Sequence, residues 1–354
     1  MNTKMTHAAF AILAATLALC APAVAQVAEQ ESSTLITNAR IFDGEHETLS
    51  EGMSVLIEGN KIARIASSIP APAGATVIDA SGKVLMPGLT DAHWHSMFNF
   101  WPISEVMTAD FGLLSIAASK AANATLLRGF TTVRDAGGNS FPVARAIDSG
   151  LIDGPRMYPS GGYISQTSGH GDFRGPNDVP ENPGTPLDYM QRVGHSLIAD
   201  GVPEVIKRSR ETLRMGATQI KVMAGGGVSS LYDPLDVTEY TVDEMKAVVE
   251  VAKTWNTYVA IHANTDAAIQ LWVDAGAMSV EHGFFISEDT AKLMAKKGVW
   301  WSMQPMDATG PDALVFESPV STAKYLQALA GLDNVVALAK KYKVKTAFGT
   351  DLLF

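Results

Sequence analysis

The feature that most constrains this chain is a strand-then-helix rhythm that starts near residue 85 and runs to the last residues. Eight short apolar runs are typical of strands: residues 84–93, 129–137, 154–162, 217–225, 257–264, 277–284, 298–305 and 344–351. Helical patterns separate them, as at residues 113–128, 203–216, 241–256, 265–276, 287–298 and 325–342. Eight such units predict an α/β fold, a (β/α)8 TIM barrel, with an open doubly wound sheet as the alternative.

Residues at the expected helix ends support this interpretation. Thr241 and Glu244 have the spacing of a capping box, which starts a helix. Gly216, Gly276 and Gly298 each precede a predicted strand and suit the left-handed residue that stops a helix.

The first 25 residues have the pattern of a signal peptide. Lys4 is followed by an apolar run at residues 8–21 and by a small-x-small cleavage site that ends at Ala25. We therefore expect an exported protein, periplasmic or secreted. Cleavage would remove Cys20, the single cysteine, so the mature chain would have no disulfide. Lipidation at Cys20 is less favoured, because the large residue Leu19 precedes it.

The rest of the chain divides at about residue 85. Residues 26–85 contain short β-type runs with Asp-Gly, Gly-Asn and Ser-Gly turns, which predict a small β-sandwich-like domain. Residues 86–354 form the predicted barrel. A net charge of −10 and the lack of a Lys/Arg cluster argue against nucleic acid as a partner. After the signal peptide no segment has transmembrane length, and a homo-oligomer is an open expectation.

Six ionisable residues stand at the ends of the predicted strands, where burial disfavours them unless something binds them. His93 and His95 are two positions apart on one strand, so their side chains point to the same face. The remaining four end separate strands: Lys221, His262, His282 and Asp351. Only a closed barrel would bring all six residues together. Histidines, an amine and a carboxylate in one place indicate a two-metal hydrolytic site.

Lys221 is the discriminating member of this set. Burial would lower the pKa of its amine, and the neutral amine can add carbon dioxide to form a carbamate that bridges two metal ions. Plain structural interpretations remain for each residue: Lys221 paired with a buried carboxylate, the histidines hydrogen-bonded in the core, and Asp351 capping a helix.

A long Gly/Pro-rich connection at residues 163–190 follows the third barrel strand. Loops of this length are commonly functional, and one in this position would lie on the catalytic face. His170 lies within it and is a candidate for contact with substrate or an oxyanion, or else an exposed loop histidine. His46 and His195 are expected to be ordinary surface or structural residues.

The motifs PGLTDAHWH, GFTTVRDAGG and AFGTD resemble the first, second and eighth strand regions of the amidohydrolase superfamily. The phrases SQTSGHGD and KVMAGGG are similar to its imidazolonepropionase-like branch, which includes Xaa-Pro and Xaa-Arg dipeptidases and ochratoxin amidases. The resemblance implies two divalent metal ions, zinc above all, bridged by a hydroxide and by N6-carboxylated Lys221.

The resemblance also implies a role for each site residue. One metal would be held by His93, His95 and Asp351, and the more exposed one by His262 and His282. Asp351 would also carry the proton from the hydroxide to the leaving amine. His170 and Tyr232 are the implied contacts to substrate or transition state, and Arg174 is a further candidate for a substrate carboxylate.

Members of this superfamily normally continue beyond the eighth strand, whereas this sequence ends at Phe354. We therefore expect a barrel truncated at its C-terminal end, without its last helix, and a 354-residue chain of low stability and low activity.

The leading hypothesis is a metal-dependent hydrolase of C–N bonds that acts on a small molecule or dipeptide, as a dipeptidase or N-acyl amino acid amidase. A one-metal deaminase is the alternative, although Thr265 stands where a proton-carrying glutamate is expected and Lys221 would have no role. The same chemistry would also allow hydrolysis of a lactone or a phosphotriester. A degenerate, non-enzymatic barrel is a further, less favoured alternative. The ligands suit zinc but admit cobalt, manganese or iron.

Overall fold

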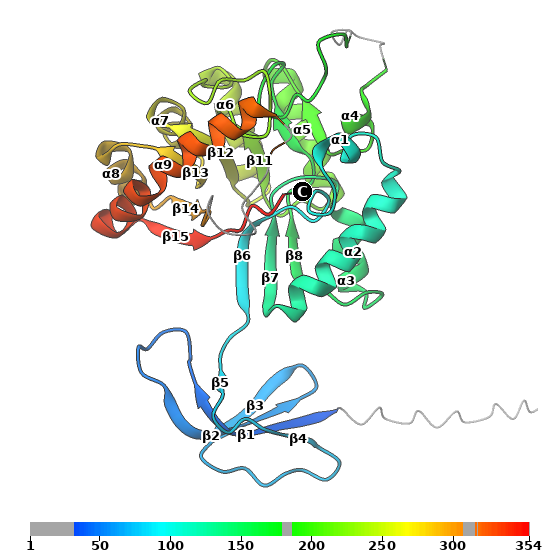
Figure 1. Ribbon diagram of the computed structural model, residues 1–354, viewed down its shortest axis with the longest axis vertical. Helices are drawn as coiled ribbons and strands as arrows, with labels where there is room; N and C mark the ends of the chain where they lie inside the picture. The colour runs from blue at the N-terminus through cyan, green and yellow to red at the C-terminus, as the bar shows by residue number, and fades with distance from the viewer. Residues whose placement is uncertain (1–31, 179–185, 307–315, 317, 354) are drawn as a thin grey trace, which may run out of the picture. The chain divides into compact units, whose positions relative to one another are not determined.

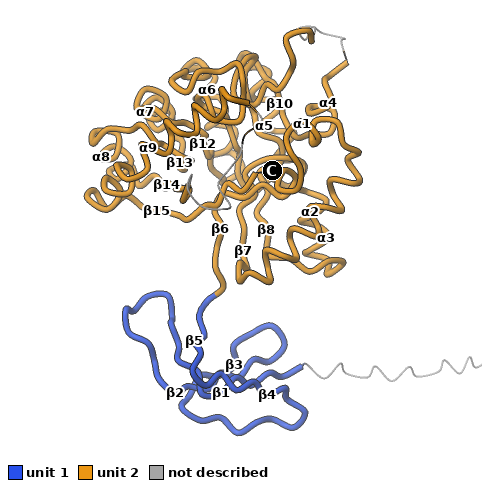
Figure 2. The backbone as a smooth tube through the Cα atoms, in the orientation of Figure 1, with its two compact units in different colours: residues 1–87 blue, residues 88–354 orange. Residues whose placement is uncertain are grey.

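The computed structural model describes residues 32–178, 186–306, 316 and 318–353. The predicted signal peptide, residues 1–25, lies outside the described residues. The chain forms two compact units, residues 1–87 and 88–354, which Figure 2 distinguishes by colour. Within the described part of the chain, no helix is both long and apolar enough to cross a membrane.

The first unit is built on a five-stranded sheet. The strand order is β3-β2-β1-β4, and β5 pairs with the end of β1. β1 runs antiparallel to β2 but parallel to β4 and β5. Its small core contains Leu35, Leu56 and Ile69. The strands are β1 (Ser33–Ile41), β2 (Ser50–Glu58), β3 (Lys61–Ala66), β4 (Thr76–Asp79) and β5 (Val84–Leu85).

The second unit has an α/β fold with parallel sheets, as predicted, and its arrangement is consistent with a TIM barrel (Figure 1). One sheet has the order β6-β7-β8, and the other β10-β9-β11-β12-β13-β14-β15. Eight of these strands overlap the eight predicted runs, and none extends more than one residue beyond its run: β6 (Leu89–Trp94), β7 (Phe130–Asp135), β8 (Arg156–Pro159), β11 (Ile220–Met223), β12 (Val259–Thr265), β13 (Ser279–Phe285), β14 (Trp300–Met303) and β15 (Lys345–Phe348). Two three-residue strands, β9 (Tyr163–Ser165) and β10 (Ser196–Ile198), were not predicted.

Helices follow the strands at the six predicted places. They are α2 (Phe111–Leu127), α5 (Val202–Met215), α6 (Val242–Thr254), α7 (Asp266–Ala275), α8 (Glu288–Lys297) and α9 (Pro319–Tyr342). The capping box at Thr241 is present, and Gly216, Gly276 and Gly298 adopt the left-handed conformation at the ends of α5, α7 and α8. Three shorter helices were missed: α1 (Ile103–Val106), α3 (Phe141–Asp148) and α4 (Tyr189–Arg192). Each is too short to show a helical period clearly.

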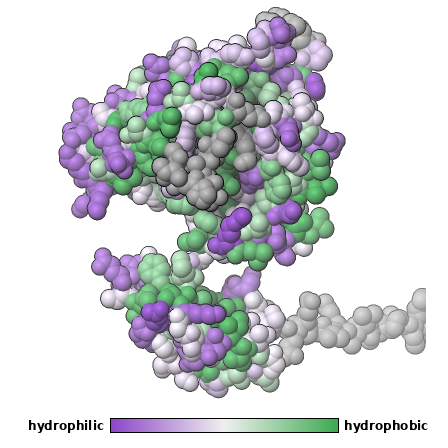
Figure 3. All heavy atoms as spheres, viewed as in Figure 1, coloured by the Kyte–Doolittle hydropathy of each residue, from purple (hydrophilic) through white to green (hydrophobic). Residues whose placement is uncertain are grey.

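The core of this unit lies between the strands and their covering helices. Strand β11 is buried at all four positions, and β12 and β13 at six of seven, as expected for parallel strands covered on both faces. Trp272 of α7 and Trp301 of β14 are fully buried against them. Hydrophilic side chains gather instead over the outer surface of α8 and the end of α9, where Lys341 pairs with Glu288 at 2.6 Å (Figure 3).

The first and last strands of the barrel order are joined by Asp91. Its carboxylate accepts from the backbone N–H and the hydroxyl of Thr350, at 3.0 and 2.6 Å, and from the N–H of His93 at 3.0 Å. The Asp351 N–H donates to the His93 carbonyl at 2.7 Å. A Cβ on Gly349 would lie 2.5 Å from the His93 Cβ, so only glycine permits this approach. Asp91 therefore holds the end of β15 beside β6.

Replacement of Asp91 by alanine should destabilise the fold. The variant leaves the buried N–H of His93 and the part-buried N–H of Thr350 without their acceptor, which costs about 1–3 kcal/mol in the free energy of unfolding. Urea denaturation followed by tryptophan fluorescence measures the loss, with Asp274→Ala on the surface of α7 as the control. Equal midpoints for Asp91→Ala and the wild-type protein would contradict this role.

Candidate active site

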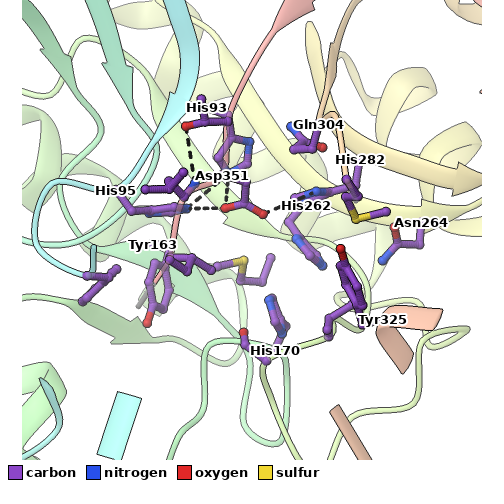
Figure 4. A pocket seen from close by; sticks show the side chains of 18 of the residues that line it. His93, His95, Tyr163, His170, His262, Asn264, His282, Gln304, Tyr325 and Asp351 are labelled. Carbon is purple, nitrogen blue, oxygen red and sulfur yellow. Dashed lines mark hydrogen bonds and ion pairs between the residues drawn. The ribbon is translucent and has the colours of Figure 1, made fainter. Parts of the chain in front are cut away.

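A cavity of about 290 Å³ opens at the carboxyl ends of the strands (Figure 4). The structure brings all six predicted residues to its wall: His93, His95, Lys221, His262, His282 and Asp351. They come from β6, β11, β12, β13 and the segment after β15, which are far apart in sequence. The parallel strands end at the same edge, so their last polar side chains converge.

His93, His95 and Asp351 form the tightest group. The Nε2 atoms of the two histidines are 3.2 Å apart, and Asp351 Oδ1 lies 3.4 Å from the first and 3.2 Å from the second. One ligand atom from each residue lies within 4.8 Å of the others, so the three could hold one metal ion.

His93 is oriented by a buried carboxylate on its other side. Its Nδ1 lies 2.8 Å from Glu281 Oε2, and Arg134 reaches both oxygens of Glu281 at 2.6 Å. Burial alone would raise the pKa of Glu281, but Arg134 and His93 hold it well below its usual range. His93 Nδ1–H donates to the ionised carboxylate, which leaves the lone pair of the neutral imidazole on Nε2.

Lys221 is 2% exposed, and its Nζ lies 3.4 Å from His93 Nε2. Burial lowers the pKa of this amine to about 8. Among the described residues, no carboxylate lies within ion-pair distance of Lys221, so the interpretation as half of a buried ion pair finds no partner there.

His262 and His282 face each other with ring centroids 4.4 Å apart. The Gly226 carbonyl lies 3.1 Å from His262 Nε2 and fixes the lone pair on Nδ1. His282 Nδ1 lies 3.9 Å from Asp351 Oδ2, which places this pair beside the first group. His282 has a left-handed backbone (φ +74°), a strained conformation that recurs at functional sites, and Trp301 bonds its carbonyl at 2.8 Å.

His170 lines the cavity and stacks on His262 with centroids 4.2 Å apart. The Ser230 hydroxyl lies 2.6 Å from its Nδ1, and its backbone N–H donates to Glu239 at 2.7 Å. Gly227 lies against its ring, because a Cβ there would approach the imidazole to 2.0 Å. His170 is therefore a buried cavity residue and not an exposed loop histidine.

Tyr232 is not brought to the cavity. Its side chain is 55% exposed and lies outside the lining, because the adjacent Asp233 turns inward. Asp233 accepts from the Gly227 N–H at 2.7 Å, and Lys324 binds the Asp233 carbonyl at 2.6 Å. These contacts fix the loop with Tyr232 on its outer side.

Three other residues considered from sequence have structural partners. The guanidinium of Arg174 pairs with Asp172 at 2.6 Å. His46 pairs with Asp43 on the surface. His195 is fully buried and accepts from the Asn139 N–H at 3.0 Å, and burial lowers its pKa to about 4.

Several residues in or behind the cavity wall were missed from sequence. A carboxylate at Glu281 inside an apolar strand, directly before His282, was a usable signal for a group that orients a ligand. The remaining wall gave no such signal because it comes from different strands, loops and α9: Phe98, Tyr163, Phe173, Asn264, Phe284, Gln304 and Tyr325.

The residues present fit a metal centre. Glu281 and the Gly137 carbonyl, 3.5 Å from His95 Nδ1, leave the lone pairs of both histidines on Nε2, facing Asp351. Burial, with the charge of Lys221, lowers the pKa of His93 to about 4, so its imidazole is neutral. Converging lone pairs repel each other unless a cation lies between them, and neutral imidazoles with a carboxylate are ligands that zinc accepts.

Known proteins share both the sequence pattern and the fold. The Amidohydrolase family pattern matches residues 84–351. Ochratoxinase of Aspergillus niger is 34% identical over 349 residues, which are 93% of this chain and 71% of the relative. Imidazolonepropionase of Paenarthrobacter aurescens is 25% identical over 307 residues, 81% of this chain and 68% of the relative.

Two solved structures are similar over most of the chain. A prolidase complexed with N-methylphosphonate-L-proline superposes with a TM-score of 0.84 at 36% identity, covering 91% of this chain and 79% of the other. A Xaa-Pro dipeptidase with bound methionine gives 0.78 at 28% identity, covering 90% and 79%. The fold and the site therefore define a hydrolase that acts on C–N bonds. The chain belongs to the Amidohydrolase family, whose members depend on metal.

Glu281→Gln should weaken metal binding. The amide oxygen can still accept from His93 Nδ1–H, but it lacks the negative charge that makes the imidazole a stronger ligand, and loss of such a partner lowers metal affinity about 10- to 100-fold. Competition with a chromophoric chelator measures the dissociation constant. Glu288→Gln, on the surface of α8, is the control and should bind zinc as the wild-type protein does. Equal affinity in both variants would show that Glu281 does not tune the centre.

The raised pKa of the Glu239 carboxyl should make the free energy of unfolding depend on pH. Burial raises the pKa of this carboxyl from 4.5 to about 9, with Asp233 and Asp172 adding to the rise. Between these pH values the folded state keeps a proton that the unfolded state releases, so the free energy of unfolding falls as pH rises. Glu239→Gln carries no such proton, and its stability should fall less steeply over this range. Urea midpoints across the pH series measure the difference, and parallel curves would contradict it.

Proposed function

We propose that this chain is an exported two-metal amidohydrolase that cleaves the amide bond of a dipeptide or an N-acyl amino acid. The single observation that carries the proposal is the convergence of four histidines, Lys221 and Asp351 on one cavity wall. Five separate segments supply these groups, and none of the four histidines or Lys221 is more than 6% exposed. A structural role alone does not account for so many buried ligand atoms.

Two divalent ions, zinc above all, would, when bound, polarise the scissile carbonyl and lower the pKa of a water molecule that they hold. His93, His95 and Asp351 would hold one ion, and His262 and His282 the other. Lys221 lies beside His93, where its carbamate would reach both groups. The lowered pKa of Lys221 is in keeping with this chemistry, which begins from the neutral amine.

Asp351 is placed to move the proton. Oδ1 lies against His93 and His95, while Oδ2 faces His282 at 3.9 Å, so the carboxylate spans both halves of the site. Its backbone N–H is held by the His93 carbonyl, which fixes its position. We assign it the transfer of the proton from the attacking water to the leaving nitrogen. His170, on the opposite wall, is the candidate for contact with the developing oxyanion (Figure 4).

The names of related structures support an amide substrate. One relative is a prolidase complexed with N-methylphosphonate-L-proline, and another is a Xaa-Pro dipeptidase with bound methionine. The cavity here is mainly apolar and aromatic, with Phe98, Phe173 and Phe284 in its wall, which suits an amino acid with an apolar side chain.

A one-metal deaminase is less well supported. The Thr265 hydroxyl caps α7 by accepting from the Ala268 N–H, so this position supplies no proton carrier. The same hydroxide chemistry could open a lactone or a phosphotriester, and these substrates belong in the test panel.

The proposal is tested by incubating the zinc-loaded protein with dipeptides and N-acyl amino acids. The panel contrasts C-terminal proline, C-terminal arginine or lysine, and aromatic leaving groups, beside a lactone, a phosphotriester and an aminopyrimidine. We expect release of free amine from at least one amide, with a loss of at least about 10²-fold in kcat for Asp351→Asn. Turnover of the aminopyrimidine alone, with release of ammonia, would favour the deaminase.

Lys221→Ala should lose activity, because no carbamate can form. Addition of a short carboxylic acid such as propionate should restore part of the rate, since the acid can fill the space left by the side chain. Lys207→Ala, on the surface helix α5, is the control. Full activity of Lys221→Ala without added acid would rule out the carbamate mechanism while leaving the fold assignment intact.

A further inference from the structure

One buried ammonium holds the loop that follows β11. Lys324 lies on α9 and is 8% exposed. Its Nζ donates to the carbonyls of Gly227, Ser230 and Asp233 at 3.0, 2.8 and 2.6 Å. An ammonium has three N–H donors, and all three are used in these contacts. One side chain therefore holds residues 227–233 at both ends and in the middle.

The same three loop residues meet the imidazole of His170. The Ser230 hydroxyl lies 2.6 Å from its Nδ1, and Asp233 Oδ2 lies 3.5 Å from the same nitrogen. Gly227 lies against Cε1 of the ring, which a Cβ would approach to 2.0 Å. Asp233 Oδ2 also accepts from the Gly227 N–H at 2.7 Å, which ties these loop residues to each other. Lys324 thus binds the carbonyls of the residues that surround His170.

This loop sets the orientation of the His170 imidazole. The backbone of His170 is fixed separately, because its N–H donates to Glu239 at 2.7 Å. The ring stacks on His262 with centroids 4.2 Å apart and 24° between the planes. The loop engages Nδ1, and among the described residues no hydrogen bond reaches Nε2. Figure 4 shows His170 across the cavity from Asp351.

Lys324 itself does not line the cavity, whereas the next residue, Tyr325, does. A substrate in the cavity would therefore meet His170 but not the ammonium. We infer that Lys324 is a positioning residue that aims His170 Nε2 at the oxyanion formed from the scissile carbonyl. This inference deepens the proposed function and rests on the role proposed there for His170.

Lys324→Met keeps the length of the side chain and removes all three donors. The loop then no longer fixes the imidazole, and a misplacement of about 1 Å can cost about 10²-fold in rate. At saturating zinc, on the amide of the panel that is hydrolysed fastest, kcat should fall by about 10- to 100-fold with little change in KM. Lys341→Met, on the same helix and paired with Glu288 on the surface, is the matched control and should keep the wild-type kcat.

A double-mutant cycle with His170→Ala separates positioning from general damage to the fold. Once the imidazole is absent, Lys324→Met should lower kcat further by less than about twofold, because its effect passes through His170. A loss that persists in full in the His170→Ala background, or a wild-type kcat in Lys324→Met, would overturn the inference. If Lys324→Met does not fold, Lys324→Gln keeps two donors for the three carbonyls and should show a smaller loss with the same dependence on His170.

Binding of methylphosphonate, a small tetrahedral oxyanion, gives a measurement without turnover. Calorimetric titration of the zinc-loaded protein should show a dissociation constant several-fold higher in Lys324→Met than in the wild-type protein, and no such difference in the His170→Ala background. This pattern without hydrolysis of any amide would retain the positioning role and overturn the proposed function. Hydrolysis of an amide, with kcat and methylphosphonate binding equal in Lys324→Met and the wild-type protein, would overturn the positioning role and leave the proposed function standing.

Discussion

The buried contact of Glu281 with Arg134 and His93 is the interaction on which the rest of the site depends. Arg134 of β7 reaches Glu281 of β13, and its Nε also donates to the Ala92 carbonyl of β6. Ser279 donates to the same carboxylate at 2.6 Å. A buried ion pair is costly unless additional hydrogen bonds satisfy its remaining donors and acceptors. The contacts of Ser279, His93 and the Ala92 carbonyl supply such hydrogen bonds here. The pair links three strands and, in addition, sets the orientation of the His93 imidazole.

This arrangement explains how a cavity can concentrate ligand atoms in a well-packed core. Burial keeps the imidazoles of His93 and His282 neutral, with their pKa values lowered to about 4 and about 3. Backbone carbonyls and Glu281 occupy the outer nitrogens, so the inner nitrogens point at one another and at Asp351. The protein holds these groups in advance, and a cation would relieve the repulsion between them.

Much of the fold and of the site could be predicted from sequence, because both follow from local patterns. The eight strands and six long helices show in apolar periodicity, and Lys221, His262 and His282 stand out as ionisable groups in apolar runs. The positions of other residues depend on contacts distant in sequence. Lys324 of α9 binds the carbonyls of Gly227, Ser230 and Asp233, and it is this anchoring that sends Tyr232 outward. Motif resemblance placed Tyr232 in the site, and nothing local in the sequence reveals the anchor.

We propose that Lys221 joins two metal positions, one at His93, His95 and Asp351 and the other at His262 and His282. Anomalous diffraction at the zinc edge, from crystals of the zinc-loaded protein, tests it most directly. We expect two peaks per chain with continuous density between them from a carboxylated Lys221. A single peak beside His93 and His95, with an unmodified Lys221 amine, would contradict it.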